Sequence, residues 1–183
     1  MAIETVITPN VVHLSFAQIV DPIPENAKYH AGKWAATLWF SKDDTDTKEQ
    51  FEKIAKQAIE HKWKTKPKGK FTGLEFLDGD DEEQAAEGEN GEEIYYQEGM
   101  WGIRCRTSRK PVVKDKYGND VTEQSKIGYT ALAKVKYTVY PWDNEHGKGL
   151  TVSPEAFMIT DFGDATSVAS DEGFEYESPI DEA

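Results

Sequence analysis

The chain contains three arginines, Arg104, Arg106 and Arg109, and all of them lie within six consecutive positions. A guanidinium group binds phosphate through two parallel hydrogen bonds and also stacks on flat rings, whereas an ammonium group acts only as a point charge. The cluster therefore suits a ligand that carries both phosphates and bases. Surface ion pairs between Arg104 or Arg106 and the acidic residues at 75–98 are the alternative interpretation.

The net charge of −13 is distributed unevenly along the sequence. Residues 75–98 contain eleven acidic residues and residues 161–183 contain eight, and neither segment contains lysine or arginine. Without these two segments the rest of the chain carries a net charge of +6. A basic body with acidic appendages is expected of a protein with a polyanionic partner, while acidic segments kept for solubility are the alternative.

The single cysteine, Cys105, excludes an intramolecular disulfide and a zinc site made of cysteine pairs, which favours a reducing compartment. No apolar run is long enough to span a bilayer, and the first ten residues lack the pattern of a signal peptide. We therefore expect a cytoplasmic protein without membrane contact. Its length of 183 residues predicts one domain with appendages.

Alternating apolar residues bounded by turn residues predict five or six strands, with the clearest candidates at 11–20, 32–40, 100–108, 129–142 and 150–160. A helix is predicted between the second and third of these, with Asp46 as its N-cap and Glu49 three residues later. Its core-facing residues recur at helical spacing, and they are Phe51, Ile54, Ala55, Ala58 and Ile59.

Lysines at every second position from 62 to 70 predict an exposed, extended segment after the helix. Together the elements predict a mainly β fold, a small five- or six-stranded barrel with one amphipathic helix, an acidic loop and an acidic C-terminal tail. We expect a binding domain over residues 1–160 and a flexible tail over residues 161–183.

Strand alternation gives the arginines a common face. On the strand at 100–108, Arg104 and Arg106 point to one side, opposite Ile103, and Arg109 follows just beyond the strand end. On the strand at 129–142, the basic and aromatic residues that share one side are Lys134, Lys136, Tyr140 and Trp142. The strand at 32–40 likewise places Lys33 and Trp39 opposite the apolar residues that are expected to face the core.

Cations beside exposed rings predict a track for single-stranded nucleic acid, because phosphates need positive charge and bases need flat partners. Each base stacked on an aromatic ring contributes about 1–3 kcal/mol whatever the base, so such binding has no sequence preference. Trp101 and Tyr137 are expected in the core instead. From their faces, the predicted binding residues are Lys33, Trp39, Arg104, Arg106, Arg109, Lys134, Lys136, Tyr140 and Trp142.

The sequence offers little support for catalysis. Its four histidines have no ligand-like spacing, and no nucleophile motif or phosphate-binding loop is present. We expect no enzyme activity, no metal site and no cofactor. A metal-dependent nuclease built from Asp78, Asp80 and Asp81 is the enzyme alternative.

Six short pieces, in their order along the chain, resemble those of tailed-phage single-stranded-DNA-binding proteins. They are "LSFAQIVDP" (14–22), "SKDD" (41–44), "LDGD" (77–80), "SRKPVV" (108–113), "YPWDN" (140–144) and "GKG" (147–149). The resemblance covers about residues 10–160 and implies an OB-fold that coats transient single strands during phage DNA replication, recombination or repair in the bacterial cytoplasm.

Some residue roles follow from this resemblance. Arg109 and Lys110 lie in the "SRKP" piece, and Tyr140 and Trp142 lie in "YPWDN", which implies that they contact DNA. Arg104, Arg106, Lys134 and Lys136 lie outside these pieces, so their role depends on the strand faces alone.

Acidic C-terminal tails are common in this class and commonly end in an aromatic residue, whereas here Phe174 and Tyr176 lie upstream of Asp181 and Glu182. Our hypothesis is that the tail occupies the basic track until DNA displaces it, and that it then contacts phage or host replication proteins. Double-stranded DNA stays open as a ligand, because phosphate attraction is not specific to single strands. An acidic DNA mimic, or an adaptor that binds a host or virion protein, is the alternative function.

Overall fold

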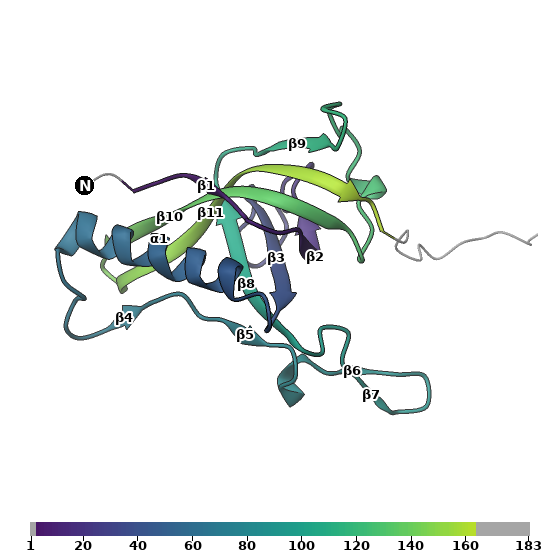
Figure 1. Ribbon diagram of the computed structural model, residues 1–183, viewed down its shortest axis with the longest axis horizontal. Helices are drawn as coiled ribbons and strands as arrows, with labels where there is room; N and C mark the ends of the chain where they lie inside the picture. The colour runs from purple at the N-terminus through teal and green to yellow at the C-terminus, as the bar shows by residue number, and fades with distance from the viewer. Residues whose placement is uncertain (1–2, 164–183) are drawn as a thin grey trace, which may run out of the picture.

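The computed structural model describes residues 3–163 (Figure 1). Its five long strands are β2 (Val12–Gln18), β3 (Trp34–Ser41), β8 (Met100–Thr107), β10 (Leu132–Asn144) and β11 (Gly147–Asp161). They pair in the order β10, β2, β3, β8 and β11, and β11 pairs again with β10, so the sheet curls into a barrel. The β8–β11 contact is a single parallel pair, Cys105 with Val152, which leaves the barrel only narrowly closed.

A partly open, five-stranded barrel of this kind is an OB-fold, which confirms the predicted fold class. Short strands extend it into a nine-stranded sheet: β1 (Val6–Ile7) pairs with β10, β5 (Leu77–Asp78) with β8, and both β4 (Phe71–Thr72) and β9 (Val112–Asp115) with β11. The sequence did not predict these additions, because strands of two to four residues are too short to show a period.

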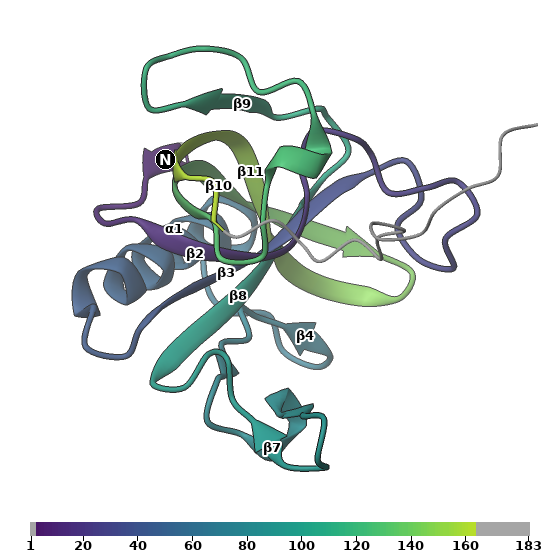
Figure 2. The same cartoon turned by 90° about the vertical axis from the view of Figure 1, so that its right-hand side faces the viewer.

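The acidic segment that we predicted to be a loop contains a 3-10 turn, η1 (Glu82–Gln84), and a small hairpin of β6 (Ala86–Glu87) and β7 (Glu93–Ile94). This hairpin projects away from the barrel in both views (Figures 1 and 2). A second 3-10 turn, η2 (Gln124–Lys126), precedes β10. Tyr129, the first residue of the strand predicted at 129–142, lies before β10 begins and is 53% exposed.

The helix α1 (Thr45–Trp63) begins two residues earlier than predicted. Asp44, not Asp46, is the N-cap: its carboxylate accepts hydrogen bonds from the Thr47 backbone N–H at 3.2 Å and from the Thr47 hydroxyl at 2.6 Å. The first of these bonds satisfies one of the free N–H groups of the first turn, which is the role of an N-cap side chain. No helix within residues 3–163 has the length and apolar character to cross a membrane.

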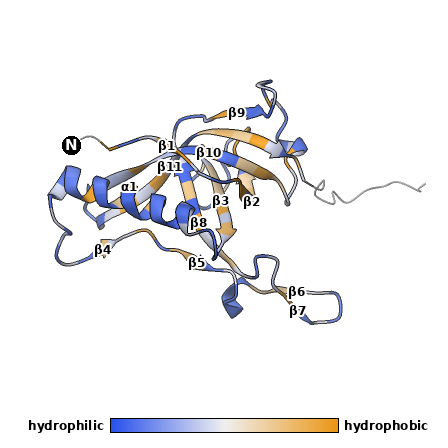
Figure 3. Cartoon of the chain, in the orientation of Figure 1, coloured by the Kyte–Doolittle hydropathy of each residue, from blue (hydrophilic) through white to orange (hydrophobic). Residues whose placement is uncertain are grey.

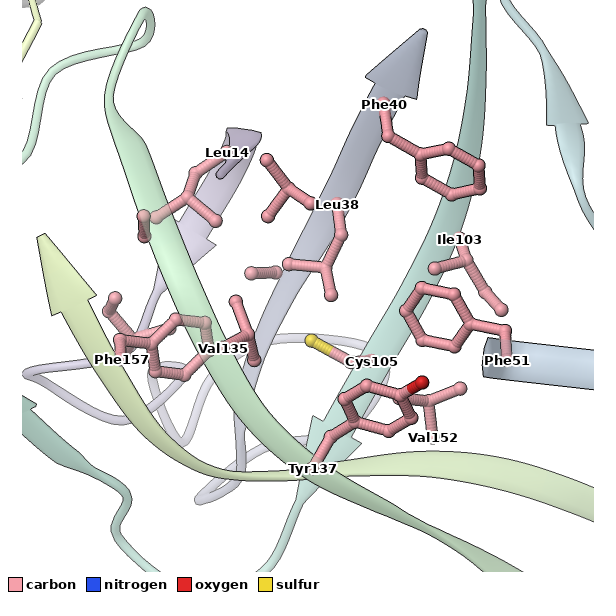
Figure 4. Packing of buried hydrophobic residues seen from close by; sticks show 14 of the residues in the cluster. Leu14, Leu38, Phe40, Phe51, Ile103, Cys105, Val135, Tyr137, Val152 and Phe157 are labelled. Carbon is pink, nitrogen blue, oxygen red and sulfur yellow. The ribbon is translucent and has the colours of Figure 1, made fainter. Parts of the chain in front are cut away.

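The core fills the barrel and the space beneath α1 (Figure 4). Phe51 of the helix stacks on Tyr137 of β10 with ring centroids 4.4 Å apart, and the Tyr137 hydroxyl donates a hydrogen bond to Gln50 Oε1 at 3.0 Å. Figure 3 shows hydrophilic residues on the outer side of α1 and hydrophobic stretches along the barrel strands. The helical stripe is therefore confirmed as core packing, with Phe51, Ile54 and Ala58 fully buried.

Candidate nucleic-acid interface

The predicted alternation on β8 is confirmed. Ile103 and Cys105 are buried in the core, Arg104 is exposed, and Arg106 is partly exposed on the opposite face. The flanking strand β3 pairs with β8 in register, with Thr37 opposite Arg104 and Ala35 opposite Arg106. Small side chains beside the arginines leave the guanidinium groups open to solvent on the outer face of the barrel.

Two adjoining depressions cross this face and share Thr72, Arg106, Leu150 and Thr151. The first has a volume of about 290 Å³, and its lining includes Phe16, His30, Ala35, Thr37, Arg104 and Arg106. The second has a volume of about 680 Å³, and its lining includes Lys33, Arg106, Arg109, Tyr140, Trp142 and His146. We call the two together the groove.

The groove joins residues that are far apart in sequence. It runs over β3 and β8, which are the second and third barrel strands in chain order. On either side lie the loop at 19–33 and the β10–β11 hairpin. These strands and loops are the parts of an OB-fold that bind oligonucleotides and oligosaccharides. Of the predicted residues, the tertiary structure brings together Lys33, Arg104, Arg106, Arg109, Tyr140 and Trp142.

Two aromatic rings of the hairpin line the second depression. Tyr140 is 62% exposed, and Trp142 is partly exposed opposite Gly149 in the β10–β11 register. A Cβ atom on Gly149 would overlap the Trp142 ring. Glycine at this position therefore lets the indole approach the backbone of β11 closely.

Phe16 is the groove residue that our sequence analysis missed. It is 91% exposed, although phenylalanine is normally a core residue, and its φ of +49° lies in the left-handed region. The β2–β3 register is interrupted between Ser15 and Gln18, and this irregularity turns the ring out of the sheet. The alternating pattern of the strand gave no signal for it, although Phe16 does lie within the "LSFAQIVDP" piece.

The arginines of the groove do not pair with the acidic segment. Within residues 3–163, none of the three forms an ion pair with a carboxylate. Arg106 instead donates from Nη1 to His30 Nε2 at 2.9 Å. Desolvation of the ring, and then the charges of Arg106 and Lys33, lower the pKa of His30, so at neutral pH the ring is uncharged and accepts this bond.

Glu75, the first residue of the acidic segment, lines the first depression, but the ion pairs of this segment are made with Lys42. Lys42 Nζ lies 2.7 Å from a carboxylate oxygen of Asp78 and 2.7 Å from one of Asp80, and it sits 4.6 Å from the centroid of the Trp101 ring. Hydrogen bonds from Lys42 lower the pKa of both carboxyl groups. The ion-pair interpretation of Arg104 and Arg106 is therefore wrong for the described residues.

Four predicted residues lie outside the groove. Trp39 is 3% exposed, lies against Gly102 and donates from Nε1 to Ser15 Oγ at 2.8 Å, so its ring offers no face to a base. Lys134 and Lys136 share the outer side of β10 with Tyr140 but lie toward the other end of this long strand. Lys110 is exposed beyond β8. The predicted tail residues Phe174, Tyr176, Asp181 and Glu182 lie outside the described residues.

The barrel topology and the position of the groove define an OB-fold protein whose groove is lined by cations and exposed aromatic rings. The chain belongs to the family described as "Enterobacter phage Enc34, ssDNA-binding protein", whose model matches residues 4–183. The resemblance to phage single-stranded-DNA-binding proteins is thereby confirmed. No curated protein sequence matches the chain.

Solved structures show the same fold. The single-stranded DNA-binding protein of bacteriophage Enc34 in a C-terminally truncated form aligns with a TM-score of 0.65 and 17% identity, covering 86% of each chain. The same phage protein in complex with ssDNA aligns with a TM-score of 0.64 and 15% identity over 85% of this chain and 86% of that one. The bacteriophage T7 protein gp2.5, also a single-stranded DNA binding protein, aligns with a TM-score of 0.58 and 16% identity. This alignment covers 97% of this chain and 100% of gp2.5.

Proposed function

We propose that this protein binds single-stranded DNA in the groove without sequence preference and acts in phage DNA replication, recombination or repair. The observation that carries the proposal is the meeting of every arginine in the chain with Phe16, Tyr140 and Trp142 on the ligand-binding face of an OB-fold. The family of the chain supports it, as does the ssDNA complex of the Enc34 protein. Lys110, beside Arg109, is proposed to contact the strand where it leaves the groove.

In the proposed mechanism, two kinds of interaction bind the strand: charge attraction to phosphates and stacking on bases. Lys33, Arg104, Arg106 and Arg109 neutralise phosphates, while the exposed rings stack on bases, and neither interaction depends on which base is present. We propose no enzyme activity, because two of the three acids of the nuclease alternative, Asp78 and Asp80, are bound to the ammonium group of Lys42.

The direct test is titration of fluorescent poly-dT and a matching duplex, with and without magnesium. Each phosphate neutralised on a single strand contributes a slope of about −0.7 to log affinity against log salt, so the four groove cations predict a slope of about −2.8 or steeper. For the variant R104Q/R106Q, the slope of log affinity against log salt should be shallower by about 1.4. A salt-independent affinity, or an R104Q/R106Q slope equal to that of the wild type, would contradict the proposal.

The same titration separates the alternatives. A DNA mimic or a virion adaptor would leave both oligonucleotides unbound, and a nuclease would shorten the DNA when magnesium is present. If the duplex bound as tightly as poly-dT, phosphate charge alone would account for binding, without base stacking.

We further propose that the acidic tail competes with DNA for the groove and, once displaced, contacts phage or host replication proteins. The truncation that tests this removes residues 164–183, because the Phe162 carbonyl accepts a hydrogen bond from the Gly128 backbone N–H at 2.8 Å and its ring packs against the core. The truncated protein should bind poly-dT more tightly, most clearly at low salt. Equal affinity at every salt concentration would disprove competition.

A further inference from the structure

The last two residues of α1 and the seven residues that join it to β4 form a strongly basic surface segment. Residues 62–70, which we call the lysine segment, contain Lys62, Lys64, Lys66, Lys68 and Lys70. The helix ends within this segment, at Trp63, because Lys64 adopts a φ of +70° while its N–H still donates to the Glu60 carbonyl at 3.2 Å. The segment then runs through Pro67 and Gly69 to β4.

Within the part of the chain that the structure describes, no carboxylate pairs with the charges of the lysine segment. All five lysines are exposed, and within residues 3–163 none of them forms an ion pair with a carboxylate. The full chain nevertheless has 34 acidic residues against 21 basic ones. Five like charges within nine residues repel one another, and a bound polyanion would relieve this repulsion.

Both ends of the lysine segment lie beside residues that line the groove. Lys62 and Tyr140 line one shallow depression of about 420 Å³, and Tyr140 also lines the groove. At the other end, β4 pairs in parallel with β11, and Thr72 of β4 lines both halves of the groove. The segment therefore passes around the tip of the β10–β11 hairpin, as the arrangement of α1, β4 and the hairpin shows (Figure 1).

We propose that a single strand leaving the groove past Tyr140 and Trp142 continues over the lysine segment, which binds its phosphates. This inference rests on the proposed function and extends the DNA path beyond the groove. The choice of residue fits the role: lysine is a flexible point charge that follows a backbone without fixing its register, whereas the groove holds the arginines, which orient phosphates and stack on bases.

The test compares K64Q/K66Q/K68Q/K70Q with the wild type on an oligo-dT length series. Short strands that fill only the groove should bind both proteins equally. Long strands should lose affinity for the variant, and the strand length at which affinity stops rising should be shorter. Each phosphate contact adds about 0.7 log unit of affinity between 1 M and 0.1 M salt. The loss of two contacts should therefore lower the affinity for long strands about 25-fold at 0.1 M salt. It should also make the slope of log affinity against log salt shallower by about 1.4.

The matched control, K28Q/K56Q/K116Q/K126Q, removes the same charge from exposed lysines outside the groove and the lysine segment. Long strands bound equally by the two variants would overturn the inference while leaving the groove proposal intact. A wild-type protein that binds no oligo-dT would overturn both. Thermal melting of each variant confirms that the fold is retained, since all of the replaced side chains are exposed.

Discussion

Replacement of Phe16 by alanine tests whether the groove binds bases as well as phosphates. The ring is 91% exposed, so its removal costs the core nothing. The backbone φ of +49° is unfavourable for a side chain with a Cβ atom, by about 1–3 kcal/mol. The fold thus holds an exposed ring in the groove at a cost in stability, which is expected where the ring serves a ligand.

The size of the effect follows from stacking. One base on one aromatic ring contributes about 1–3 kcal/mol, and about 1.4 kcal/mol corresponds to a tenfold change in Kd, so F16A should weaken poly-dT binding about 5- to 150-fold. The slope of log affinity against log salt should stay unchanged, because no cation is removed. Fluorescence anisotropy of labelled poly-dT over a salt series measures both quantities.

Two further variants make the result decisive. Y117A removes another exposed ring, 78% exposed on the turn after β9 and outside the groove, and should bind like the wild type. F16G should be at least as stable as F16A in a thermal melt, because glycine adopts positive φ without a Cβ penalty. Wild-type affinity in F16A, or an equal loss in Y117A, would refute the stacking role of Phe16.

Three other predictions concern the surface, the helix and the core. K134Q/K136Q should change poly-dT affinity much less than R104Q/R106Q in the same titration, because the two lysines lie outside the groove; an equal loss would place DNA along β10 as well. D44A should lower the free energy of unfolding in urea by about 0.5–2 kcal/mol through loss of the N-cap, and D46A by less, because Asp46 contributes only charge near the helix N-terminus. The reverse order would mean that Asp46 caps the helix. Burial raises the pKa of Cys105 to about 12, so at pH 8 the thiol should resist alkylation in the folded protein and react once urea unfolds it. Rapid labelling of the native protein would contradict its burial.

The long elements could be read from sequence because their signals are local. Period-2 alternation identified all five barrel strands to within a few residues and assigned Arg104 and Ile103 to opposite faces of β8. The helical stripe through Phe51 was equally clear. Each of these patterns repeats several times within one element, so an error at one residue does not obscure it. The helix N-cap lacked such repetition, and Asp44 and Asp46 could be separated only by the hydrogen bonds that Asp44 accepts.

The groove required the tertiary structure, because its walls come from five separate parts of the chain. Sequence alone established that the cations and rings exist and which side of each strand they occupy. The twist and closure of the barrel decided that Tyr140 and Trp142 meet Arg106 while Lys134 and Lys136, on the same side of the same strand, do not. The structure also changed which aromatic rings are available to a ligand. Packing against Gly102 buries Trp39, which we predicted to bind, while a positive φ exposes Phe16, which we did not predict. Alternation states which way a side chain points relative to its own strand, but only the packing of neighbouring strands determines whether that side is open to a ligand.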